Sequence, residues 1–185
     1  MLSRRNLLGI ALTGLGTGLT GGCVTLPGPG EEGWNVGNRI PDIALRNADG
    51  FTIRLSDYHD RAMLFYIGGE WCVHCRQGIP ELAKTWRALK DDPRIAFVAM
   101  SYAEAPETTR RWINDKAGIG MTVLHPPSRS SRVPLVNGGH MAFSAPTVYV
   151  LTAGNIIHAW RVGASQDAYY RTALLEAAYA IPARG

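Results

Sequence analysis

Two kinds of hydrophobic pattern alternate along the chain. Continuous apolar runs predict buried strands, and apolar residues at three- and four-residue spacing, such as Ile79, Leu82 and Trp86, predict helices. The expected order is strand 62–67, helix 73–90, strand 94–101, helix 106–117, strand 121–124, strands 147–151 and 156–162, and a last helix capped by Ser165 or Asp167. This order predicts an α/β fold with a mixed central sheet and helices on both faces.

Two other segments have a weaker pattern. Residues 36–58 predict a loop and a short edge strand or hairpin, with Asp49-Gly50 as the turn signal. Residues 125–140 form a long polar connection with three prolines and two arginines. A connection of that length inside a compact domain is usually functional or mobile.

The first 34 residues have the pattern of a targeting segment and a tether. Arg4-Arg5 before an apolar stretch resembles a bacterial twin-arginine export signal, with an ordinary secretory signal as the alternative. Cys23 after Gly21-Gly22 resembles the end of a lipobox, so we expect lipidation there, against soluble export or an uncleaved anchor. The expected division is signal peptide 1–22, Gly/Pro-rich tether 23–34 including Trp34, and domain 35–183.

Composition agrees with one globular domain. The chain has 185 residues, of which 46% are hydrophobic and 18% are charged. Its formal net charge is +4, and Arg4 and Arg5 lie in the segment expected to be removed. There is no run of lysine and arginine of the kind that marks nucleic-acid binding, so no nucleic-acid partner is predicted.

Cysteine spacing gives the strongest chemical signal. Cys72 and Cys75 lie where a predicted strand ends and a helix begins, and a disulfide between them would close a loop too small to stabilise much. The positive end of the helix favours a thiolate, which is the nucleophile of disulfide exchange. We therefore expect Cys72 to attack a partner disulfide and Cys75, one turn further in, to resolve the product.

A family resemblance extends this interpretation. The segment Trp71-Cys72-Val73-His74-Cys75 between a strand and a Pro-containing helix resembles the thioredoxin superfamily. Residues 36–58 and 145–151 resemble its extracytoplasmic TlpA/ResA-like branch, which is related to the AhpC/TSA proteins. The resemblance implies a thioredoxin-like fold with an N-terminal strand or hairpin extension.

The same resemblance implies roles for particular residues. Cys72 and Cys75 would form the redox-active disulfide, with no other cofactor. A cis peptide bond before Pro146 would place the Ala145 backbone beside Cys72, where an extended partner segment can pair. Trp71 would cover the disulfide and form part of the partner surface.

Several positions depart from the thioredoxin pattern. The usual proline before the second cysteine is His74, which we expect to stabilise the Cys72 thiolate, with helix capping as its alternative. The buried aspartate six residues before the first cysteine is Tyr66, and the aromatic residue four before it is Gly68. Glu70 is then the remaining carboxylate for proton transfer, unless it is a plain surface residue.

Alternative functions remain open. His74 also resembles the strong oxidant DsbA, so an oxidising role is one alternative. A Sco-like copper module using Cys72, Cys75 and His140 is another, and a purely structural disulfide is the third. A peroxiredoxin is not predicted, because Phe65 and Gly69 occupy its required Pro and Thr/Ser positions.

The resemblance also implies where the protein acts and on what. We expect an exported, lipid-anchored protein on the periplasmic or extracytoplasmic side of a bacterial membrane. Its partners would be envelope proteins with thiols or disulfides, such as apocytochrome c or oxidase assembly factors, and a membrane electron donor or acceptor. The direction of electron flow stays open between reduction and oxidation of the partner.

Overall fold

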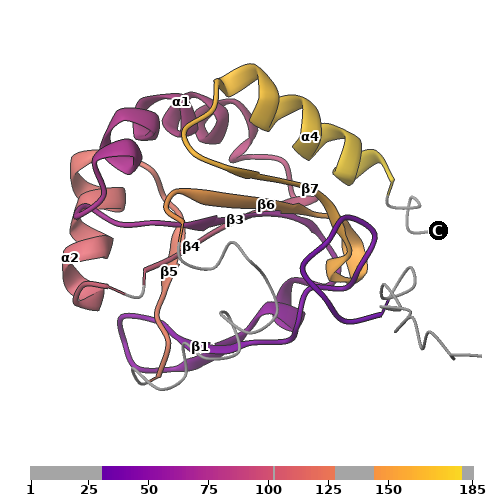
Figure 1. The fold of residues 1–185 in the computed structure, drawn as a ribbon, viewed down its shortest axis with the longest axis horizontal. Coiled ribbons are helices and arrows are strands. Elements are labelled where there is room, and N and C mark those ends of the chain that lie inside the picture. Colours follow the sequence, from indigo (N-terminus) through magenta and orange to yellow (C-terminus); the bar gives the residue numbers. More distant parts are fainter. Residues whose placement is uncertain (1–30, 102, 128–143, 181–185) are drawn as a thin grey trace, which may run out of the picture.

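A five-stranded sheet in the order β5-β4-β3-β6-β7 forms the centre of the molecule (Figure 1). The computed structural model describes residues 31–101, 103–127 and 144–180. The strands of the sheet are β3 Ala62–Ile67, β4 Ile95–Met100, β5 Thr122–Leu124, β6 Thr147–Leu151 and β7 Ile157–Val162. Strands β3, β4 and β5 are parallel, whereas β6 is antiparallel to both β3 and β7. The predicted mixed sheet is therefore confirmed.

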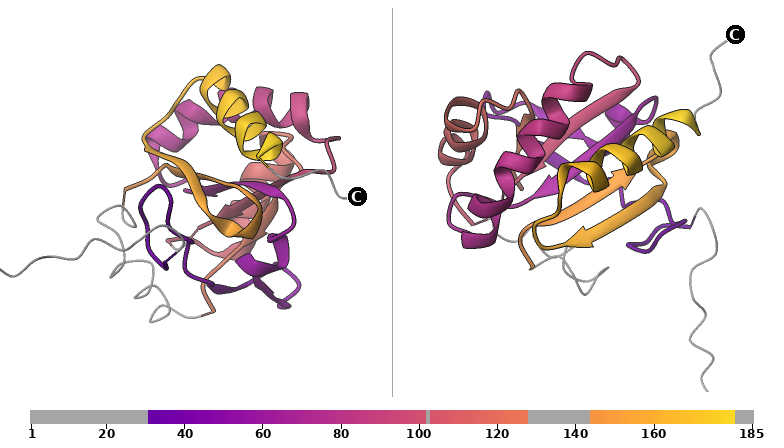
Figure 2. Two further views of the ribbon diagram at one scale, coloured as in Figure 1. Left: turned by 90° about the vertical axis from the view of Figure 1, so that its right-hand side faces the viewer. Right: turned by 90° about the horizontal axis from the view of Figure 1, so that it is seen from above.

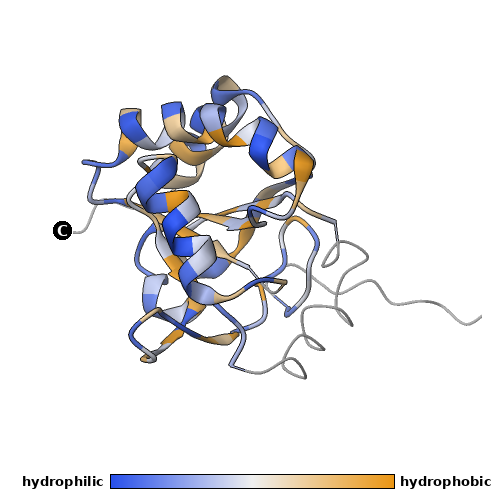
Figure 3. Cartoon of the chain, turned by 90° about the vertical axis from the view of Figure 1, so that its left-hand side faces the viewer, coloured by the Kyte–Doolittle hydropathy of each residue, from blue (hydrophilic) through white to orange (hydrophobic). Residues whose placement is uncertain are grey.

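The sequence predicted helices on both faces of this sheet, but the helices that pack on it share one hydrophobic cluster and cover one face. Helices α1 Val73–Leu89 and α4 Asp167–Tyr179 lie side by side above it (Figures 1 and 2). Helix α2 Pro106–Arg110 continues as the π-helical segment η2 Arg111–Lys116 near the β5 edge. Hydrophilic and hydrophobic residues alternate along the helices (Figure 3), as expected when one side of each helix is buried.

The N-terminal part of the domain covers the opposite face. Strands β1 Ala44–Arg46 and β2 Thr52–Arg54 form an antiparallel hairpin, followed by the 3-10 turn η1 Leu55–Tyr58. Gly50 has φ 85° in the hairpin loop, a conformation that glycine adopts without strain. The expected N-terminal hairpin and its Asp49-Gly50 turn are thus both present.

Strand β3 supplies side chains to both cores, because successive residues of a strand point to opposite faces. Leu64 and Tyr66 pack with α1 and α4 in one hydrophobic cluster. Phe65 and Ile67 pack with the N-terminal segment in the other. Tyr66 is the last residue of β3 to face α1, so it lies directly beneath the start of that helix.

Two expectations about sequence boundaries need correction. Trp34 is not part of a free tether: it is only 5% exposed and its ring lies 5.6 Å from that of Tyr149. The domain therefore begins before residue 35. The last helix is capped by Gln166 rather than by Ser165 or Asp167. The Gln166 side chain makes no capping hydrogen bond, and the Asp167 N–H donates instead to Glu81 Oε2 at 3.2 Å. Cys23 and most of the tether lie outside the described residues.

Within the described ranges, no helix has both the length and the apolar character that a membrane span requires.

The buried position of Trp34 leads to a stability prediction. Trp34→Ala should lower the free energy of unfolding by about 3 kcal/mol, because it removes a large side chain from the hydrophobic cluster between the sheet and the N-terminal segment. Urea denaturation followed by circular dichroism measures this change. Val36→Ala is the matched control, because Val36 is 60% exposed and should change stability little. Equal losses in the two variants would show that residue 34 does not belong to the core.

Candidate redox active site

Cys72 is the residue that begins helix α1. Its backbone is extended (φ −89°, ψ 121°), and its Sγ accepts a hydrogen bond of 3.1 Å from the backbone N–H of Cys75. The sulfur thus occupies the capping position that a serine or aspartate oxygen takes in other helices. Unpaired N–H groups and the helix dipole at this end stabilise negative charge on such an atom.

A second contact of Cys72 comes from a distant part of the chain. Its Sγ–H donates to the carbonyl oxygen of Ala145 at 3.2 Å. The Ala145–Pro146 peptide bond is cis, the isomer expected from the sequence. The Pro146 carbonyl in turn accepts from Gly163 N–H at 2.7 Å, which ties this loop to the end of β7. The structure therefore places the Ala145 backbone beside Cys72, and the role of Pro146 in pairing with a partner stays a prediction.

Cys75 lies deeper than Cys72. It has no exposed surface, while Cys72 keeps 6%. Burial raises the pKa of the Cys75 thiol to about 12, with the neighbouring Cys72 sulfur also contributing. Cys75 is therefore protonated at neutral pH unless its surroundings change. Because Cys72 is less buried than Cys75, Cys72 is the sulfur that a partner would reach first.

Both cysteines are free thiols in this structure, so the predicted Cys72–Cys75 disulfide stays a prediction.

Tyr66 and Gly68 enclose the inner side of Cys75. A Cβ at Gly68 would lie 2.8 Å from Cys75 Sγ and 2.8 Å from the Tyr66 hydroxyl oxygen. Real side chains do not tolerate contacts this short, so position 68 requires glycine as long as Tyr66 is present. The Tyr66 hydroxyl and the Cys75 sulfur are thus neighbours around one small space.

The exposed residues of the motif surround Cys72. Trp71 is 45% exposed and Val73 is 54% exposed, so both present apolar surface beside a sulfur that is nearly covered. His74 is exposed on the first turn of α1. Its expected effect on the Cys72 thiolate stays a prediction.

Glu70 is held at the surface. Its carboxylate forms a 2.5 Å ion pair with Lys116 of η2, and its backbone carbonyl accepts from the Arg76 guanidinium. These contacts direct the carboxylate toward η2 and show a structural role. The proton-transfer role proposed for Glu70 gains no contact in its favour and stays a hypothesis.

Glu104 is a site residue that the sequence pattern did not indicate. Its Oε1 accepts from Glu70 N–H at 3.1 Å and from the Thr109 hydroxyl at 2.7 Å. The space beside Gly69 is bounded by the same oxygen and by Trp71 Nε1, each 2.6 Å from where a Cβ would be. Glu104 thus supports the loop that carries Trp71 and Cys72.

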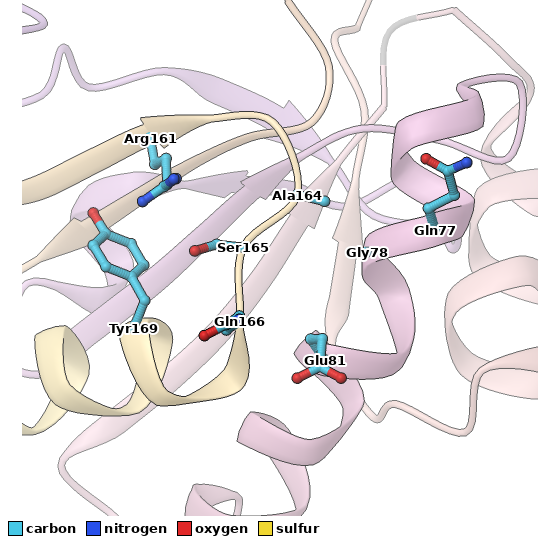
Figure 4. A pocket seen from close by; sticks show the side chains of 8 residues that line it. All are labelled: Gln77, Gly78, Glu81, Arg161, Ala164, Ser165, Gln166 and Tyr169. Atoms are coloured by element: carbon cyan, nitrogen blue, oxygen red, sulfur yellow. The ribbon is translucent and has the colours of Figure 1, made fainter.

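A polar pocket of about 430 Å³ lies between α1 and the connection from β7 to α4 (Figure 4). Gly78 packs against Ala164 at its centre, and Arg161 lies over the Tyr169 ring at 5.3 Å. Its lining begins two residues after Cys75, at Gln77. Of the residues that line the pocket, Ser165 was named from the sequence, as a candidate helix cap, and none was expected to form a site.

The copper alternative depends partly on His140, which lies outside the described residues. In the part of the chain that the structure describes, no group of three or more His, Cys, Asp or Glu residues is arranged to hold a metal ion. The third ligand proposed from the sequence is therefore untested.

The support that Glu104 gives to the loop can be tested. Glu104→Ala should lower the free energy of unfolding by about 1 kcal/mol, because the Glu70 N–H loses its partly buried acceptor. It should also slow disulfide exchange with a small aromatic disulfide. Glu107→Ala is the matched control, since Glu107 is exposed and pairs only with Arg110 at the surface. Unchanged stability and exchange rate in Glu104→Ala would contradict the assignment.

Comparisons with known proteins agree with this geometry. The AhpC/TSA family model matches residues 36–159. Thiol-disulfide oxidoreductase ResA of Bacillus subtilis is 26% identical over 76 residues, which are 41% of this chain and 42% of ResA. The match thus spans less than half the length of that relative.

Solved structures show the same fold. A secreted thiol-disulfide isomerase from Corynebacterium glutamicum superimposes with TM-score 0.67 at 19% identity, covering 80% of this chain and 90% of that protein. A thiol:disulfide interchange protein of the thioredoxin family from Chlorobium tepidum gives TM-score 0.62 at 18% identity, covering 76% and 95%. The predicted thioredoxin-like fold is confirmed, and because the family model matches more than half of the sequence, this chain belongs to the AhpC/TSA family.

Proposed function

We propose that this protein is a thiol:disulfide oxidoreductase that exchanges disulfides with protein partners through Cys72 and Cys75. The observation that carries the proposal is the unequal placement of the two sulfurs. Cys72 Sγ caps a helix and contacts the Ala145 carbonyl, while Cys75 is fully buried behind it. A structural disulfide would not need a helix terminus directed at one of its sulfurs.

The chemistry follows in two exchange steps. The Cys72 thiolate attacks a partner disulfide, so that a Cys72–partner bond forms and one partner sulfur leaves as a thiolate that takes up a proton. Cys75 then loses its proton and attacks Cys72 Sγ, which breaks the mixed disulfide and releases the second partner sulfur. The partner gains two electrons, and the Cys72–Cys75 pair is oxidised. The reverse sequence oxidises a partner.

Surface features around Cys72 support a protein partner. Trp71 and Val73 offer exposed apolar contacts on either side of the sulfur. The Ala145 backbone lies at the same sulfur, so an extended partner segment pairing there would bring its own cysteine to Cys72. Relatives with this fold are named as thiol:disulfide interchange and isomerase proteins, which supports the same reaction.

The N-terminal sequence supports an extracytoplasmic site of action. We propose that the chain is exported and attached to a membrane through Cys23, where it exchanges disulfides with envelope proteins. The names of relatives support exchange chemistry rather than peroxidase chemistry, and the positions that a peroxidatic site requires hold Phe65 and Gly69. The redox disulfide itself would be the cofactor.

Trapping a mixed disulfide tests the proposed roles. Cys75→Ser should accumulate a covalent adduct between Cys72 and a disulfide-containing peptide, because the resolving thiol is missing. Cys72→Ser should accumulate little, since Cys75 is fully buried. Mass spectrometry of non-reduced samples identifies the adduct, and the double variant gives the background. Equal trapping by both single variants, or by neither, would overturn the proposal.

The reduction potential tests the direction of electron flow. His74→Ala should make the potential of the couple more negative by about 30 mV, or tenfold in the exchange equilibrium, if His74 stabilises the reduced form. Equilibration in glutathione buffers followed by tryptophan fluorescence measures it. Val73→Ala, the neighbouring exposed position, should leave the potential unchanged. A wild-type value near −270 mV would indicate a reductant, and one near −120 mV an oxidant.

A further inference from the structure

The Tyr66 hydroxyl is a buried polar group without a hydrogen-bond partner. The residue is 3% exposed, and its oxygen makes no hydrogen bond of normal geometry with any described residue. Desolvation of an unpaired hydroxyl is costly, so such a group calls for an explanation. A second buried tyrosine on the same face, Tyr170, differs because its hydroxyl accepts from Ser165 N–H at 3.1 Å.

The nearest reactive group to this hydroxyl in the described structure is the sulfur of Cys75, with which it shares the space beside Gly68. Ala99 and Val148 flank Tyr66 in the sheet through β4 and β6. Beyond the end of β3, a Cβ at Gly68 would lie 2.8 Å from both the Tyr66 hydroxyl oxygen and Cys75 Sγ. These two atoms therefore border the same small space beside Gly68. In the dithiol form the hydroxyl and the sulfur are neighbours, but they do not have the geometry of a hydrogen bond.

We propose that Tyr66 is a catalytic residue of the second exchange step, in which its hydroxyl donates a hydrogen bond to the Cys75 thiolate as that sulfur attacks Cys72. This inference rests on the proposed function. The Cys75 S–H bond breaks, a Cys72–Cys75 bond forms, and the Cys72–partner bond breaks. The proton lost by Cys75 is balanced by the proton that the departing partner thiolate takes up.

The electrostatics of the site fit a donor rather than a proton acceptor. Burial raises the pKa of Tyr66 well above its usual value, and the adjacent Cys75 and Cys72 sulfurs raise it further. Tyr66 therefore keeps its proton at neutral pH and is available as a hydrogen-bond donor to a thiolate. The Tyr66 hydroxyl beside Cys75 acts to lower the pKa of Cys75, against the larger effect of burial, which raises it. Tyr170 is the other titratable group that faces this cluster.

The two steps can be observed separately with 5,5′-dithiobis(2-nitrobenzoate) as the partner disulfide. Attack by Cys72 releases one coloured thiolate, and resolution by Cys75 releases the second. In the full chain, Tyr66→Phe should leave the first release unchanged and slow the second about tenfold or more, because a hydrogen bond to a charged sulfur is lost. Its pH profile should move about one unit toward alkaline pH.

Tyr170→Phe is the matched control, because it removes a buried tyrosine hydroxyl that is already paired with Ser165. It should change neither release. An unchanged second release in Tyr66→Phe would overturn the inference, and so would a uniform slowing without a shift of the pH profile. Absence of the first release from the wild-type protein would instead overturn the proposed function, so the two failures are distinguishable.

A second substitution, which keeps the hydroxyl as well as the ring, tests the proposal if Tyr66→Phe folds poorly. Replacing Tyr66 with 3,5-difluorotyrosine makes the hydroxyl a stronger donor. The second release should then be faster than in the wild type at a pH where the fluorinated phenol is still protonated. A second release that is unchanged or slower would count against hydrogen-bond donation by Tyr66.

Discussion

The antiparallel pairing of β3 with β6 is the constraint on which the site depends. Ile67 pairs with Thr147, so the residues that follow β3 and those that precede β6 meet at the same edge of the sheet. This register brings the Ala145 carbonyl to Cys72 Sγ, although the two residues are 73 positions apart. A slip of the register by one residue would move this carbonyl and also exchange the two faces of β6, whose residues are all buried.

The parallel pairing of β3 with β4 gives the site its second support. Because parallel strands end at the same edge, the segment after Met100 lies beside the loop after Ile67. Glu104 comes from that segment and accepts from the backbone of Glu70. The loop that carries Cys72 is thus held from one side by the Glu104 carboxylate and from the other by the Ala145 carbonyl. Helix α1 begins at Cys72 and fixes the end of this loop. Three elements fix one sulfur, which is the preorganisation that exchange chemistry requires.

The elements and the two cysteines could be predicted because their signals are local. Apolar runs and helical spacing within about twenty residues locate β3 and α1, and a two-residue spacing places both sulfurs on one turn. Glu104 could not be found in this way, because only the sheet order brings it to Glu70. Trp34 was misassigned for the same reason: its glycine-rich surroundings have the composition of a linker, and its burial comes from the distant Tyr149.

Two departures from the thioredoxin pattern that look independent in the sequence are one change in the structure. Tyr66 replaces an aspartate and Gly68 replaces an aromatic residue, two positions apart near the end of β3. A side chain at 68 would collide with Cys75 Sγ and also with the Tyr66 hydroxyl, so the tyrosine at 66 adds a second obstacle to any side chain at 68. A carboxylate at 66 could accept the proton of Cys75, whereas a phenol of raised pKa keeps its own. On the proposed mechanism, replacing the aspartate with Tyr66 gives the buried sulfur a hydrogen-bond donor instead of a base, and the proton of Cys75 needs an acceptor other than residue 66.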